Sequence, residues 1–170
     1  MRAVVANGHD KRRDNYALRV ISRELARELQ PYLRWQPSNG DEFFIPQPEI
    51  ADSVFLVSDM VVELVTRDND TRFHFNGTVE WALDSVQVGQ VIWLPREDQL
   101  RTLLGAYFLS LDAGPDGFVV TVSGPGRAMH TPPERAAADA YARALLHVVG
   151  QGGSPADDVQ ASNQRASNAR

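Results

Sequence analysis

The side chains best suited by type and spacing to do chemistry are four carboxylates, Asp59, Glu63, Glu80 and Asp84. Asp59 and Glu63 are four residues apart on a predicted strand, so they share one face of it. Glu80 and Asp84 flank Trp81. Carboxylates that converge bind Mg²⁺ or act as a general acid and base. One interpretation is therefore a metal-dependent hydrolase. The other is that all four are solvent-facing residues of strands and turns.

Motifs of the common enzyme classes are missing from the sequence. There is no Gly-Lys pair for a nucleotide phosphate loop, no GxGxxG and no GxSxG. The chain has no cysteine, which excludes disulfides, zinc–thiolate sites and cysteine nucleophiles. The four histidines, at positions 9, 74, 130 and 147, are never at helical spacing from one another, so no zincin-type site is expected. We expect no cofactor.

Trp81, Trp93 and Arg96 are candidates for a binding surface, because tryptophan and arginine are common anchors of protein interfaces. Packing in or beside the core is the alternative for both tryptophans. The formal charge of −5 makes a nucleic-acid partner improbable and suits a basic protein partner. The leading expectation is thus a non-enzymatic protein-binding or accessory module. An immunity or antitoxin-type protein is a special case of that function.

Two stretches carry a resemblance to a known group of proteins. They are FNGTVEWALDS at Phe75–Ser85 and WLPREDQL at Trp93–Leu100, preceded by VSDM at Val57–Met60. They resemble short actinobacterial proteins labelled pilus assembly protein CpaE, over about Ile21 to Val149. The resemblance implies a cytosolic bacterial protein linked to pilus assembly. Full-length proteins of that name resemble a receiver-like domain joined to an ATPase with a lysine-bearing phosphate loop. The one lysine here, Lys11, lies in no such loop, so no ATP-binding residue is carried over.

Three helices are predicted to position these residues. The first begins near Asp14 or Asn15 and ends at Pro31. Its apolar face consists of Leu18, Ile21, Leu25 and Leu29. The second follows Pro95, and the third runs from a capping box at Thr131–Glu134 to Gly150. The core-facing stripe of the second helix is Leu100, Leu103, Leu104, Tyr107, Phe108 and Leu111. That of the third is Ala137, Tyr141, Leu145 and Val148.

Segments rich in β-branched and aromatic residues, or with alternating polarity, predict the strands. They are Phe43–Ile45, Ser53–Ser58, Met60–Thr66, Arg72–Asn76, Gln90–Leu94 and Phe118–Ser123. Met60–Thr66 and Arg72–Asn76 are expected to form a hairpin. A turn is expected at Ser38–Asp41. Short loops between successive strands favour an α+β fold: a mostly antiparallel sheet of about five strands with three helices packed against it.

The length of 170 residues favours one domain. We expect a flexible N-terminal segment at 1–13, a single α+β domain at 14–150 and a disordered tail at 151–170, which is poor in apolar residues. No apolar run is long enough to cross a membrane, and the N-terminus does not read as an export signal. The predicted location is the cytoplasm, with no membrane partner.

Overall fold

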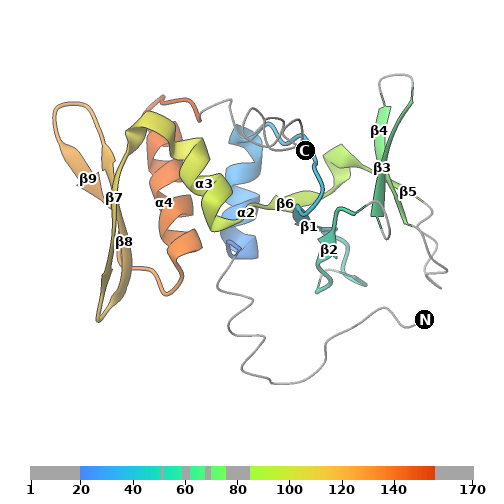
Figure 1. Cartoon of the computed structure of the whole chain (residues 1–170), viewed down its shortest axis with the longest axis horizontal. Coiled ribbons are helices and arrows are strands. Elements are labelled where there is room, and N and C mark those ends of the chain that lie inside the picture. Colours follow the sequence, from blue (N-terminus) through green and yellow to red (C-terminus); the bar gives the residue numbers. More distant parts are fainter. Residues whose placement is uncertain (1–19, 51, 59–61, 68–69, 76–84, 156–170) are drawn as a thin grey trace, which may run out of the picture. The chain divides into compact units, whose positions relative to one another are not determined.

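The computed structural model describes residues 20–50, 52–58, 62–67, 70–75 and 85–155 (Figure 1). The chain divides into two compact units. The first, which we call the inserted unit, is Trp35–Leu94. The second, the helical unit, combines residues 20–34 with residues 95–155 and so is built from both sides of the insertion.

The inserted unit contains two three-stranded antiparallel sheets. The first has the order β2-β1-β6 and the second the order β3-β4-β5. The strands are β1 (Glu42–Phe44), β2 (Phe55–Leu56), β3 (Val62–Arg67), β4 (Asp70–Phe75), β5 (Ser85–Gln87) and β6 (Ile92–Leu94), and η2 (Val88–Gln90) is a 3-10 turn. The register pairs Phe43 with Phe55 on one side of β1 and with Trp93 on the other, so β1 is the central strand.

Aromatic rings fill the core of the inserted unit. Phe43 and Phe73 are fully buried and stack with their ring centroids 4.4 Å apart. Phe55 lies 5.5 Å from Phe43, and Trp35 lies 5.7 Å from Phe73. Because Phe43 belongs to one sheet and Phe73 to the other, their stacking holds the two sheets of this unit together.

The helical unit has three α-helices among its described residues and one antiparallel sheet of order β7-β8-β9. Its elements are α2 (Arg23–Leu29), η1 (Gln30–Tyr32), α3 (Glu97–Leu104), η3 (Gly105–Tyr107), β7 (Phe108–Gly114), β8 (Gly117–Ser123), β9 (Ala128–His130) and α4 (Ala137–Gly150). Helix α4 contacts β8, α3 and α2. It is rich in alanine and buried on most of its surface, as expected of a helix that is covered on several sides.

A carboxylate on α4 holds the start of α2. The backbone N–H of Ser22, the N-cap of α2, donates a hydrogen bond of 2.7 Å to Oδ1 of Asp139. Burial raises the pKa of Asp139 above its ordinary value, although the hydrogen bonds from Ser22 and the charge of Arg143 oppose that shift. Arg143 itself donates to Glu134 at 2.9 Å.

The α+β class, the antiparallel pairing and the hairpin of β3 with β4 are confirmed. The turn at Ser38–Asp41 is confirmed too, with Gly40 at a φ of 88°. The apolar faces of the first and last helices are buried as expected at Leu25, Leu29, Tyr141 and Leu145. A single sheet of about five strands is wrong: in the described residues, nine strands form three sheets of three.

Three predicted helix extents are wrong. Helix α2 begins at Arg23, after its N-cap Ser22, so Ile21 lies before the helix and not on its apolar face. The second helix ends at Leu104, so Tyr107 lies in η3, while Phe108 and Leu111 belong to β7. The last helix begins at Ala137 and not after a capping box at Thr131–Glu134. Instead, Thr131 Oγ1 accepts the N–H of Val120, and Glu134 forms a bridge with Phe118, so this segment continues along β8.

Several expectations fall on residues outside the described ranges. They are the N-terminal segment 1–13, the helix start at Asp14 or Asn15, and most of the predicted tail, from residue 156 onward. Within the part of the chain that the structure describes, no helix has the length and apolar character needed to cross a membrane.

Candidate functional site

Of the four predicted carboxylates, Asp59, Glu80 and Asp84 lie outside the described residues. Glu63 is described and is exposed on β3, where it pairs in register with His74 of β4. Among the described residues, no three histidine, aspartate or glutamate side chains are grouped in a way that suits a metal ion. The described part of the chain therefore gives the hydrolase interpretation no support.

Two of the three predicted binding residues are described, and both have structural contacts. Trp93 is buried and stacks on Trp35 with an interplanar angle of 5° and a centroid distance of 5.8 Å. Arg96 is the N-cap of α3: its N–H donates to Gln99 Oε1 at 3.0 Å, and its guanidinium binds Asp98. Trp93 and Arg96 belong to different compact units. The third residue, Trp81, lies outside the described ranges.

An exposed apolar surface lies on the inserted unit instead. Four large apolar side chains are exposed among the described residues, and two of them, Val54 and Leu56, are neighbours at β2. Val54 is 44% exposed and Leu56 is 48% exposed. The other two, Tyr32 and Leu109, are far apart in the sequence. The segment Val54–Leu56, which we call the β2 edge, is thus the main concentration of exposed apolar side chains in the described residues.

Phe55 determines which way the side chains of the β2 edge point. Its ring packs against Phe43 and, edge to face at 5.4 Å, against Phe75. Side chains alternate between the two faces of a strand, so anchoring Phe55 in the core places Val54 and Leu56 on the opposite face. The apolar residues of the β2 edge are therefore exposed because of the register of the strand.

The backbone of the β2 edge is also directed outward. The N–H of Val57 donates to the carbonyl of Asp41 at 2.8 Å, so Val57 and Asp41 form a hydrogen-bonded pair of the ladder. In an antiparallel ladder such pairs alternate with non-hydrogen-bonded ones. Phe55 therefore bonds to β1, and the N–H and C=O groups of Val54 and Leu56 point away from β1. Among the described residues β2 has β1 as its only neighbouring strand.

The turn before β1 fixes the position of β2. Gly40 donates its N–H to the carbonyl of Val57 at 2.9 Å, and it has the positive φ that favours glycine. The buried carboxylate of Asp41 accepts hydrogen bonds from Trp35 Nε1 at 2.9 Å and from the backbone N–H of Ser38 at 3.0 Å. This network joins the turn, the tryptophan and the end of β2, so the edge is presented by a rigid support.

The other edge strands of the described sheets expose less apolar surface. None of the large apolar residues of β3, β5, β6 or β9 is exposed. All three residues of β6 are buried. Strand β7 carries an exposed Leu109, but its register shifts between Phe108 and Ser110, and the exposed Asp112 follows shortly after. Bulges and charged side chains are devices that prevent an edge from pairing with another chain. The β2 edge has neither device, and its neighbouring charges, Glu49 and Asp52, are exposed on the preceding turn.

Sequence reasoning did not single out Val54 and Leu56. The sequence did carry one indication of this surface. The run Val54–Val57 is apolar at every position, and it follows closely after Pro46 and Pro48. A strand with apolar residues on both faces is either central or an edge that awaits a partner. Burial alone distinguishes these two cases, and burial is visible only in the structure.

Comparisons with known proteins identified no relative of this chain. No protein-family model, no curated protein and no solved structure matches the chain significantly.

Proposed function

We propose that this chain is a protein-binding module that takes an extended, basic segment of a partner protein as an added strand at the β2 edge. The observation that carries the proposal is the coincidence, at Val54 and Leu56, of exposed apolar side chains with outward-facing backbone groups. Strand addition uses both features: the backbone supplies affinity, and alternate side chains supply specificity.

Charge determines the kind of partner. Glu49 and Asp52 are exposed just before β2, and the whole chain carries a formal charge of −5. A basic segment is attracted to such a surface, and an acidic one is repelled. We infer a partner strand that alternates apolar residues with lysine or arginine.

The size of the β2 edge limits the affinity. Full burial of a valine or leucine side chain is worth about 1.5–3 kcal/mol, and these two side chains are already about half covered. Their burial therefore contributes about 1.5–3 kcal/mol together, to which each new hydrogen bond adds about 1 kcal/mol. Loss of mobility on association offsets part of this gain. The interaction is consequently weak and reversible unless the partner makes further contacts.

A peptide of about six residues that alternates valine and lysine, capped at both ends, tests the proposal. We expect saturable binding by calorimetry or fluorescence anisotropy, and at least about tenfold weaker binding to Leu56→Lys, which brings a positive charge to the edge. The matched control is Leu109→Lys, since Leu109 is 52% exposed and lies on the other unit. A peptide that alternates valine and glutamate serves as the charge control.

Equal binding of both peptides, or an equal loss in Leu56→Lys and Leu109→Lys, would show that the β2 edge is not the binding surface. The variants should fold, because neither leucine is buried.

The identity of the partner follows from the cellular context that we propose. A chain without cysteine is typical of a reducing compartment, so we place the protein in the cytoplasm. The resemblance described above suggests a pilus-assembly partner, whereas an immunity or antitoxin function requires a toxin. The gene neighbourhood distinguishes the two: a pilus operon favours the first and an adjacent toxin gene the second.

A further inference from the structure

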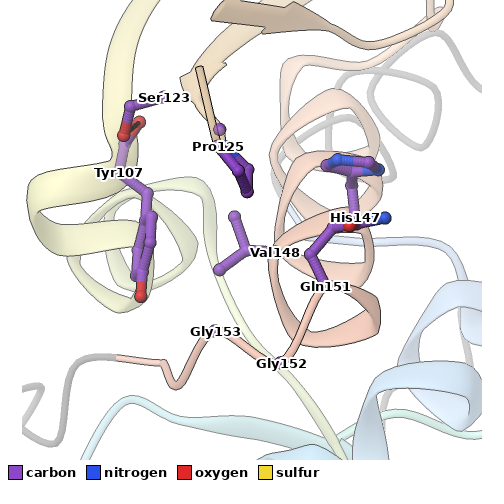
Figure 2. Close-up of a pocket in the computed structure, with 9 residues that line it drawn as sticks. Tyr107, Ser123, Pro125, His147, Val148, Gln151, Gly152 and Gly153 are labelled. Atoms are coloured by element: carbon purple, nitrogen blue, oxygen red, sulfur yellow. Dashed lines mark hydrogen bonds between the residues drawn. The ribbon is translucent and has the colours of Figure 1, made fainter. Parts of the chain in front are cut away.

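A cavity of about 310 Å³ lies in the helical unit, where the end of α4 meets η3 and the turn between β8 and β9 (Figure 2). It belongs to a different unit from the β2 edge. Its volume is at the lower end of the range of small-molecule sites. The lining residues are Tyr107, Ser123, Gly124, Pro125, His147, Val148, Gln151, Gly152 and Gly153.

The end of α4 forms one wall of the cavity. Gly153 donates its N–H to the carbonyl of Val148 at 2.9 Å, and Gly152, at a φ of 79°, donates to that of Val149 at 3.0 Å. These two bonds define a Schellman motif, in which the residue at the position of Gly153 commonly packs an apolar side chain against the helix.

No side chain fits at Gly153. A Cβ there would lie 2.6 Å from Val148 Cγ1 and 3.2 Å from the hydroxyl of Tyr107. The backbone itself therefore forms this wall, pressed against Val148 and Tyr107. Gly153 thus lines the cavity with backbone and not with a side chain.

Three polar side chains surround the cavity without a protein partner. The hydroxyl of Tyr107, the imidazole of His147 and the carboxamide of Gln151 make no hydrogen bond to any residue in the described ranges. Figure 2 shows Tyr107 on one side of the cavity and His147 with Gln151 on the other. His147 and Gln151 are four residues apart, which aligns them along the same side of the α4 terminus. A small cavity with a few convergent donors and acceptors is the usual form of a ligand site.

The charge of the lining selects the ligand. None of the nine lining residues is an aspartate, glutamate, lysine or arginine. The C-terminal end of a helix carries partial negative charge, which disfavours anions. The carboxamide of Gln151 and the hydroxyl of Tyr107 each donate and accept, and a neutral group that also does both can use the full capacity of the two.

We propose that this cavity binds a small uncharged molecule with a planar carboxamide. The amide exchanges hydrogen bonds with Gln151 and Tyr107, and its apolar part lies against Val148 and Pro125. The proposal is independent of strand addition at the β2 edge, because it uses only residues of the helical unit.

Benzamide and benzoate test this proposal as a pair, since they have nearly the same shape and differ in charge. Titration of the full chain is followed by the NMR shifts of its backbone amides. We expect benzamide to shift the amides of Gly124, Gln151, Gly152 and Gly153 in a saturable way, at millimolar concentrations typical of so small a ligand. Benzoate should bind at least about threefold more weakly.

The variants Gln151→Ala and Tyr107→Phe each remove one polar partner and should weaken benzamide binding several-fold. Gln47→Ala is the matched control, because Gln47 is an exposed glutamine of the inserted unit; it should leave binding unchanged. The proposal is overturned if benzamide shifts no amide of the cavity, if benzoate binds equally well, or if both cavity variants bind benzamide as the parent does. The amide spectra also report whether each variant is folded.

Discussion

Replacement of Phe43 by alanine tests the aromatic core that supports the β2 edge. Phe43 is fully buried, stacks on Phe73 at 4.4 Å and on Phe55 at 5.5 Å, and lies 6.0 Å from Trp35. Truncation of a buried phenylalanine to alanine costs about 3–5 kcal/mol. Aromatic pairs add about 0.5–1.5 kcal/mol beyond the area that they bury. With three ring partners, we expect a loss near the upper end, about 4–5 kcal/mol.

The tryptophans of the chain offer a selective assay. All three, at positions 35, 81 and 93, fall within the inserted unit, Trp35–Leu94. Urea unfolding followed by tryptophan fluorescence therefore reports the free energy of unfolding of this unit. For Phe43→Ala we expect a large fall in the urea midpoint. If the free energy of unfolding of the inserted unit in the parent is below about 5 kcal/mol, the unit should already be unfolded without urea.

Two further variants calibrate the result. Phe43→Leu keeps more of the side-chain volume and should lose less stability than Phe43→Ala. Leu56→Ala alters an exposed residue of the neighbouring strand and should stay within about 0.5 kcal/mol of the parent. A loss below about 0.5 kcal/mol for Phe43→Ala would refute the assignment of this ring to the core.

Two other predictions concern titration and metals. Because burial raises the pKa of Asp139 above 3.8, the folded chain holds this proton more tightly than the unfolded chain, so the contribution of Asp139 to stability falls as pH rises from about 3.8 through the raised value. Asp139→Asn lacks this titration, so its free energy of unfolding relative to that of the parent should increase over the same pH interval. Thermal unfolding at a series of pH values measures this difference. A decrease would show that burial does not raise the pKa of Asp139. Millimolar Mg²⁺, Mn²⁺ or Ca²⁺ should leave the melting temperature unchanged, since binding to the folded state would raise it. A rise of several degrees that Glu63→Gln abolishes would instead favour the carboxylate hydrolase.

Local patterns in the sequence predicted the elements but not every boundary. Leu103, Leu104, Tyr107, Phe108 and Leu111 have helical spacing, yet the helix stops at Leu104. Phe108 and Leu111 belong to β7, where the register shift beside Ser110 changes the usual alternation of side chains. The overlooked signal was Gly105, which has a φ of 52° and ends α3.

Long-range pairing explains the wrong sheet. The β3–β4 hairpin is local and was predicted, whereas β1 pairs with β6, and Phe43 lies opposite Trp93. No local pattern specifies a partner that is so distant in the sequence. The Thr131–Glu134 segment shows the same effect, because pairing of Glu134 with Phe118 takes precedence over a capping box.

The candidate site was beyond sequence reasoning for a similar reason. The sequence shows that Val54–Val57 is apolar, but the exposure of Val54 and Leu56 depends on Phe55 packing against Phe43 and Phe75. The outward direction of their backbone groups depends on the bond between Val57 and Asp41. Both are tertiary contacts, so they become visible only when the strands are paired.

Amide hydrogen exchange across β2, with and without the valine–lysine peptide, tests strand addition most directly. In the free protein the N–H of Phe55 is bonded to β1 and should exchange slowly, whereas those of Val54 and Leu56 point outward and should exchange faster. The account predicts that saturating peptide slows exchange at Val54 and Leu56 and changes Phe55 little. Unchanged exchange at both residues, with peptide demonstrably bound, would contradict strand addition at the β2 edge.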